Sequence, residues 1–143
     1  WVSGRKDVAM RRAAKYADGW LPYMYTPEQM AESVTKIKRF GEELGQDMSG
    51  FKYGLYIFTA VHEDNDFAVK MAADRLSVQY AQDFNKLVHK YALAGNPDYC
   101  ISRLQEYVDA GASFIFVSSA CPDGYISENL AQIANSVIPA FRT

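Results

Sequence analysis

Apolar and polar positions alternate in blocks along the chain, and the blocks predict strands and helices in turn. Short apolar runs rich in β-forming residues have the length of strands. There are four of them: Val2 to Gly4, Gly19 to Met24, Tyr53 to Val61 and Phe114 to Ser119. The third, YGLYIFTAV, is apolar almost throughout, which is typical of a parallel strand covered on both faces. Pro22 has no N–H to donate, so we expect it near the end of the second strand.

Helical periodicity fills the segments between these runs. Thr26, Pro27 and Gln29 together indicate a capped helix start, and Asn96 followed by proline indicates another. The first two expected helices are Lys6 to Tyr16 and Pro27 to about Leu44, the second ended by Gly45. A long helical stretch follows from Asp66 to about Leu93, either continuous or broken near residues 82–84. A further helix begins at Pro97 and is stopped by Gly111, and a last helix is capped by Ser127. The side chains expected to face inward are Val8, Met10, Ala13, Ala14 and Ala17, then Met30, Val34, Ile37, Phe40 and Leu44, then Ile101, Leu104, Tyr107 and Val108, and finally Leu130, Ile133, Ala134 and Val137.

The alternation of strand and helix predicts an α/β fold with parallel strands. No low-complexity linker interrupts it, so the sequence predicts a single domain over residues 1–143. Four such units fit either a small doubly wound sheet or half of a (β/α)8 barrel. The pattern of apolar residues does not separate these two folds.

Composition narrows the functional class. Lys and Arg number 15 and Asp and Glu 17, giving a net charge of -2, and no basic block stands out. Nucleic acid and acidic membranes are therefore poor candidates for partners. The apolar runs are too short to span a bilayer. Cys100 and Cys121 are too few and too far apart for a disulfide framework or a zinc site, so we expect a reduced, cytoplasmic setting.

Three stretches, in order, resemble the second half of a luciferase-like monooxygenase. They are VSGRKDVAMRRAAKYADGWLPY, GNPDYCISRLQEYVDAGASFIFV and ENLAQIANSVIP. The resemblance implies a TIM barrel of which this chain forms roughly the last four βα units, with a helical insertion after the third strand. It also implies FMN or the deazaflavin F420 as cofactor and a small organic substrate. ADGWLPY followed by TPEQ slightly favours the F420 branch.

The resemblance leaves the first four βα units without a counterpart in this chain. We therefore expect a segment of a flavin- or F420-dependent oxidoreductase that is inactive alone, its catalytic residues unknown. The alternative is a non-catalytic α/β module that has lost its cofactor. A half-barrel would leave strand edges unpaired, and for that reason we expect self-association, as a homodimer.

The turn Ser3-Gly4-Arg5 is the leading candidate for a cofactor-binding site. Ligands of α/β folds gather at the carboxyl ends of strands, and helix N-termini bind anions. Glycine lets the backbone approach a phosphate closely. Arg5 and Lys6 lie where the helix dipole disfavours cations, and a bound anion would reverse that penalty. The resemblance implies that this turn contacts the cofactor phosphate.

Other candidates follow the remaining strands. The resemblance places Tyr23 and Met24 near the cofactor phosphate or its chain. His62 follows the third strand and Ser119 ends the fourth, so both are candidates for substrate binding. Cys121 has no activating partner nearby in sequence and is interpreted as a buried residue, not a nucleophile.

Overall fold

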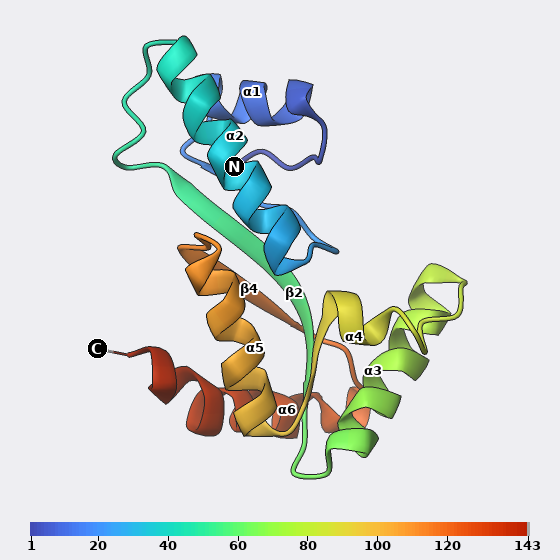
Figure 1. Ribbon diagram of the computed structural model, residues 1–143. Helices are drawn as coiled ribbons and strands as arrows, with labels where there is room; N and C mark the ends of the chain where they lie inside the picture. The colour runs from blue at the N-terminus through green and yellow to red at the C-terminus, as the bar shows by residue number, and fades with distance from the viewer. Residues whose placement is uncertain (143) are drawn as a thin grey trace. The chain divides into compact units, whose positions relative to one another are not determined.

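The computed structural model describes residues 1–142, which form two compact units. The first unit contains residues 1–56 and 106–116, and the second contains residues 57–105 and the segment from Val117 onward. Helices and strands alternate and the pairing of the sheet is parallel (Figure 1), which confirms the predicted α/β class. Each unit is described in turn.

The longest strand, β2 (Lys52–Val61), is the one to which the other strands pair. In the first unit it pairs with β1 (Gly19–Trp20), and β4 (Phe114–Ser119) also pairs with β2. The predicted second strand is shorter than expected, because proline at position 22 has no N–H to extend the ladder. Beyond β1 only isolated bridges remain, Val2 to Trp20 and Tyr23 to Tyr56.

Two helices of the first unit, α1 (Asp7–Tyr16) and α2 (Pro27–Glu43), pack side by side (Figure 1). The predicted capping box of α2 is present, and its expected apolar stripe is buried except for the half-buried Leu44. Val8 on α1 was expected to face inward but is 78% exposed. At about 100° per residue, Val8 lies some 200° from Met10, which is buried, so the two cannot share a face.

The long stretch predicted as one helix is divided in the second unit. It forms α3 (Asn65–Tyr80), α4 (Val88–Tyr91) and a buried strand, β3 (Ala92–Gly95), that pairs in parallel with the end of β2. Ala81 ends α3 in a left-handed conformation. Sequence analysis missed β3 because ALAG has neither alternation nor β-branched residues. Next comes α5 (Pro97–Asp109), whose first turn is capped as predicted by the Asn96 side chain, 2.9 Å from the Tyr99 nitrogen.

The C-terminal segment changes helix type along its length. It consists of η1 (Asp123–Tyr125), α6 (Ile126–Gln132), the π-helical η2 (Ile133–Val137) and η3 (Ile138–Phe141). Ser127 is not its cap, because α6 already begins at Ile126. Ile133 and Val137 are buried as predicted, whereas Leu130 and Ala134 are exposed. The buried face instead begins at Asn129, four residues before Ile133.

None of the helices within residues 1–142 combines the length and the apolarity needed to cross a membrane.

Candidate functional site

The turn Ser3-Gly4-Arg5 connects the first bridge of the sheet to α1. Gly4 has a φ of +128°, and a Cβ placed there would lie 2.6 Å from the Cβ of Ala9. Only glycine fits this combination of backbone angle and space. The Gly4 carbonyl accepts a hydrogen bond from Nε1 of the buried Trp20 at 2.9 Å. The turn is therefore held in one shape, and Ser3 on it is exposed.

Arg5 lies against the segment that follows β1. Its Nη2 donates a hydrogen bond to the Tyr23 carbonyl at 3.1 Å. Its guanidinium lies 5.3 Å from the ring centre of Tyr23 and 5.8 Å from that of Tyr25, within cation–π range. Met24, between them, is buried with a φ of +55°, an uncommon angle for a residue other than glycine. The structure thus brings Arg5 and Tyr23 together, as a shared cofactor site would require.

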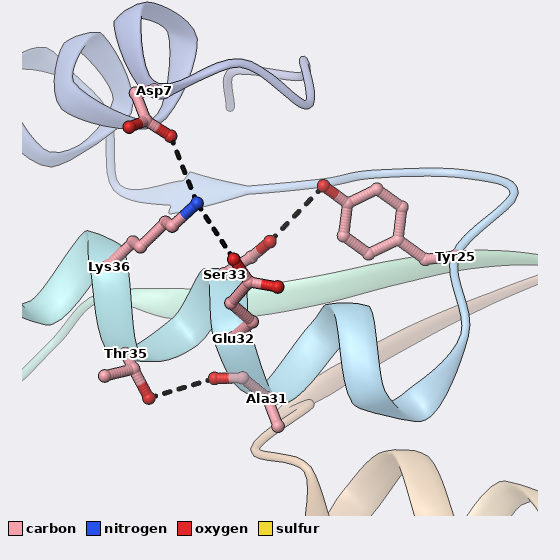
Figure 2. Close-up of polar contacts among 7 residues, drawn as sticks. All are labelled: Asp7, Tyr25, Ala31, Glu32, Ser33, Thr35 and Lys36. Carbon is pink, nitrogen blue, oxygen red and sulfur yellow. Dashed lines mark hydrogen bonds and ion pairs between the residues drawn. The ribbon is translucent and has the colours of Figure 1, made fainter.

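Tyr25 forms the rigid support beneath Arg5. Its hydroxyl accepts a hydrogen bond from Ser33 of α2 at 3.3 Å (Figure 2). Its carbonyl accepts one from the Tyr107 hydroxyl at 2.7 Å, and its ring packs against Trp20 at 5.5 Å. Because these partners fix Tyr25 from several sides, the aromatic surface beneath Arg5 is preorganised.

The N-terminus of α1 has no side-chain cap within residues 1–142. Lys6 occupies the N-cap position in an extended conformation. The acidic residue of the first turn, Asp7, lies 3.4 Å from Nζ of Lys36 (Figure 2). The pKa of Lys36 is raised, first by its hydrogen bond to Glu32 and then by the charge of Asp7. Arg5, Lys6 and the helix dipole therefore present positive charge at this turn, while Asp7 is directed to Lys36.

A second polar group lies in the other unit, at the carboxyl end of β2. Asn129 of α6 is fully buried and makes three hydrogen bonds. Its Oδ1 accepts from the Val61 nitrogen at 2.8 Å, and its Nδ2 donates to the Thr59 carbonyl and to the Ser119 hydroxyl, both at 3.0 Å. Asn129 therefore fixes the ends of β2 and β4. The available sequence signal was its place four residues before Ile133, on the apolar face of a helix.

His62 and Ser119 both border this polar group. Nδ1 of His62 accepts a hydrogen bond from the Asp64 nitrogen at 2.9 Å. The imidazole lies 4.8 Å from the Phe67 ring and 6.0 Å from the Tyr125 ring. Tyr125 in turn donates to the Val61 carbonyl at 3.0 Å. Asn129 bonds Ser119, and the Tyr125 ring adjoins His62, so each candidate neighbours a side chain that bonds the end of β2.

The two cysteines are free and buried. Burial raises the pKa of Cys100 to about 12 and also raises the pKa of Cys121. Both thiols are therefore protonated near neutral pH, in agreement with their interpretation as buried residues and not nucleophiles. Within residues 1–142, no group of three or more His, Cys, Asp or Glu side chains is arranged to hold a metal ion.

Comparison with known protein families identifies the family of this chain. The family model described as luciferase-like monooxygenase matches residues 1–113. The chain belongs to the luciferase-like monooxygenase family. No curated protein matches the chain significantly.

Solved structures of luciferase-like enzymes share the fold. The F420-dependent tetrahydromethanopterin reductase from Methanopyrus kandleri is 18% identical, with a TM-score of 0.78 over 98% of this chain and 50% of its own. An F420-dependent secondary alcohol dehydrogenase, solved with an F420-acetone adduct, is 16% identical, with a TM-score of 0.81 over 99% of this chain and 48% of its own.

A monooxygenase from Streptomyces bottropensis, RslO1, is 17% identical, with a TM-score of 0.77 over 98% of this chain and 47% of its own. The chain thus spans about half the length of these structures. These matches confirm the predicted partial TIM barrel.

Proposed function

We propose that this chain provides the cofactor-phosphate side of a flavin- or F420-dependent luciferase-like oxidoreductase. Ser3, Gly4 and Arg5 bind the phosphate, and Tyr23 and Met24 line the adjoining surface. The single observation that carries this proposal is the arrangement around Gly4. There an uncapped helix N-terminus, a backbone that admits only glycine and a preorganised arginine occur within one turn.

The residues present fit a phosphate group. An incoming oxyanion can accept hydrogen bonds from first-turn backbone N–H groups and from Arg5, whose guanidinium has five N–H donors. A Cβ at position 4 would fill part of this turn. The aromatic surface of Tyr23 and Tyr25 holds Arg5 close to the helix start, so less side-chain entropy is lost when the anion binds.

A bound flavin or deazaflavin supplies the redox chemistry in enzymes that use such a cofactor. This chain's own residues position it and bind substrate. We assign His62 and Ser119 to a small organic substrate, because each follows the carboxyl end of a strand and each is held by neighbouring side chains. The choice between FMN and F420 stays open, with two F420-dependent enzymes among the similar folds. A cytoplasmic location stays a prediction.

The test is a fluorescence titration of the native protein with FMN and with F420, repeated for Arg5→Gln. Hydrogen bonds to charged groups contribute about 1.5–3 kcal/mol, so the variant should bind the cofactor about 10- to 100-fold more weakly. Arg12→Gln is the matched control, because Arg12 is an exposed arginine within α1, the helix that follows the Arg5 turn. Failure of the native protein to bind either cofactor would contradict the proposal, as would equal losses in both variants.

A second candidate is a non-catalytic, self-associating module, and one observation favours it. The rings of Trp1, Phe114 and Phe116 form a cluster with centroid distances of 5.6, 6.3 and 4.8 Å, yet each side chain is more than 40% exposed. Exposed aromatic clusters often mark interaction surfaces. Under this hypothesis the cluster is buried in a homodimer. Light scattering after size-exclusion chromatography tests it, and a monomer that binds no cofactor would contradict both candidates.

A further inference from the structure

A pocket of about 310 Å³ lies in the second unit, between one face of α3 and Pro122. Phe67, Met71 and Val78 supply its apolar wall, at positions i, i+4 and i+11 of the helix. Residues at these spacings share one helix face. The volume is at the lower end of the range of small-molecule sites, about 300–1,000 Å³. The pocket therefore suits a small ligand.

The fold alone does not account for this apolar face. The opposite, inner face of α3 already buries Ala68, Ala72 and Leu76 completely. On the pocket side, Met71 is itself buried at 6% exposure, but the flanking Phe67 is 49% exposed and Val78 is 82% exposed. A helix that covers a core needs one apolar stripe, with polar residues on the other side. The second stripe of α3 is thus an apolar surface available to a ligand.

Two ion pairs border the pocket, and they differ in length. Nζ of Lys70 lies 2.6 Å from Asp74, one turn away on the same helix. Nη2 of Arg75 lies 3.6 Å from Asp123, whose side chain is 82% exposed. Both pairs are exposed and contribute little, since Lys70 and Asp74 are 71% and 62% exposed, but Lys70 has a short contact with Asp74 whereas the Arg75 contact is long. Arg75 is therefore the cation that can exchange Asp123 for another carboxylate.

We propose that this pocket binds a small monocarboxylate with an apolar chain. The chain of the ligand lies along Phe67, Met71 and Val78, and its carboxylate replaces Asp123 at Arg75. A guanidinium is weakly hydrated and can form two parallel hydrogen bonds with a carboxylate. Arg75 should therefore prefer the carboxylate of the ligand, held in the apolar pocket, over the hydrated carboxylate of Asp123. This site is separate from the cofactor turn and does not depend on the proposed redox function.

Methionine methyl groups offer a direct readout. Met71 lies in the pocket and is the one methionine of the second unit, while Met10, Met24, Met30 and Met48 belong to the first. We would label the native protein with ¹³C at the methionine methyls and titrate it with octanoate. The Met71 signal should shift and saturate, and the other four should stay in place. Butyrate, octan-1-ol and octylammonium test chain length and charge.

Two exposed valines provide matched variants. Val78→Asp places a carboxylate at the pocket and should weaken octanoate binding at least tenfold by repulsion and lost apolar contact. Val8→Asp makes the same change on α1, where valine is 78% exposed, and should leave binding unchanged. Arg75→Gln should weaken octanoate binding about tenfold or more, but should not weaken binding of octan-1-ol.

Each outcome decides the proposal. A saturable Met71 shift that Val78→Asp abolishes and Val8→Asp preserves supports it. Equal shifts at all five methionines would indicate non-specific association and overturn it, and so would the absence of any shift. If octylammonium or octan-1-ol binds as tightly as octanoate, the assignment of Arg75 to a carboxylate is wrong. Loss of cofactor binding in the flavin titration would leave these results unaffected.

Discussion

Two helices that begin just after sheet segments, α1 in the first unit and α3 in the second, start in opposite ways. The first turn of α3 is capped by Asp64, whose carboxylate accepts a hydrogen bond from the Phe67 nitrogen at 3.1 Å. The N-cap of α1 is Lys6, which supplies no side-chain cap and adds positive charge. Both N-cap residues have extended backbone angles, so geometry does not explain the difference.

The difference concerns how backbone N–H and C=O groups obtain hydrogen-bond partners in each unit. In the second unit, Asn129, Tyr125 and Asp64 bond the backbone at and beyond the end of β2 from within the chain. In the first unit, the start of α1 has an arginine and a glycine turn beside it instead. The uncapped N–H groups of an exposed helix start bond to water or to an anion, and a side-chain cap or a bound anion stabilises the helix further. The contrast therefore separates a strand end whose backbone groups are bonded by the chain's own side chains from a helix start that is open to an anion.

The largest expected effect is in the second unit. Asn129→Ala leaves the buried Val61 N–H without a partner, at about 1–3 kcal/mol, and removes the Asn129 hydrogen bonds to the Thr59 carbonyl and to Ser119, at about 0.5–1.5 kcal/mol each. The Thr59 carbonyl keeps its bond from the Ala120 nitrogen at 2.9 Å. The free energy of unfolding should therefore fall by about 4 kcal/mol. Urea denaturation measures this. Leu130→Ala, at an exposed neighbouring position, should cost less than about 1 kcal/mol. Equal losses in the two variants would show that Asn129 is not the residue that holds the strand ends.

The second expected effect is a loss of folding stability at alkaline pH, caused by Cys100. Burial raises the folded pKa of this thiol from 9.0 to about 12, so the unfolded chain loses its proton first. The unfolded state then binds fewer protons between these pH values, and stability falls as pH rises. The slope approaches about 1.4 kcal/mol per pH unit, and because the unfolded thiol is half deprotonated at pH 9, the loss from this group between pH 9 and pH 11 is about 2 kcal/mol. Cys100→Ala should remove that component, and parallel stability curves for the two proteins would contradict it.

Sequence reasoning predicted the elements whose determinants are local. The capping box at Thr26, the glycine stop at Gly45 and the apolar run of β2 each depend on adjacent residues, and each is present. It missed β3 because the strand character of ALAG comes from pairing with the distant residues 58–61. Alanine and leucine favour helices when no partner strand is considered.

The candidate site shows the same limit. The glycine turn and Arg5 were visible because glycine, cations and a helix start are adjacent in sequence. Asn129 was not, because its three partners lie up to 70 positions away. A local sequence pattern cannot identify a helical residue that forms hydrogen bonds with two strands. Burying an asparagine on an apolar helix face costs free energy unless it is hydrogen-bonded, and its partners here are distant in sequence.

A smaller effect tests the cap of α3. Asp64→Ala removes the carboxylate that bonds the Phe67 nitrogen, and helix caps of this kind contribute about 1 kcal/mol. Asp66→Ala, in the first turn of the same helix, removes a charge without removing the cap and should cost about half as much or less. Thermal and urea unfolding should rank the variants in that order. A reversed order would mean that the charge, and not the cap, stabilises this helix start.

The smallest change in stability gives the most direct test of α1. Lys6 already has the extended backbone of an N-cap, so Lys6→Asp should supply the missing cap and raise the free energy of unfolding by about 0.5 kcal/mol. The same carboxylate would occupy the N–H groups proposed for the cofactor phosphate and repel it. Cofactor affinity should therefore fall while stability rises.

Lys86→Asp, at an exposed position outside any helix, controls for the reversed charge and should change neither cofactor affinity nor stability. A stabilised Lys6→Asp protein that binds FMN and F420 as tightly as the native one would show that the open helix start does not serve a phosphate.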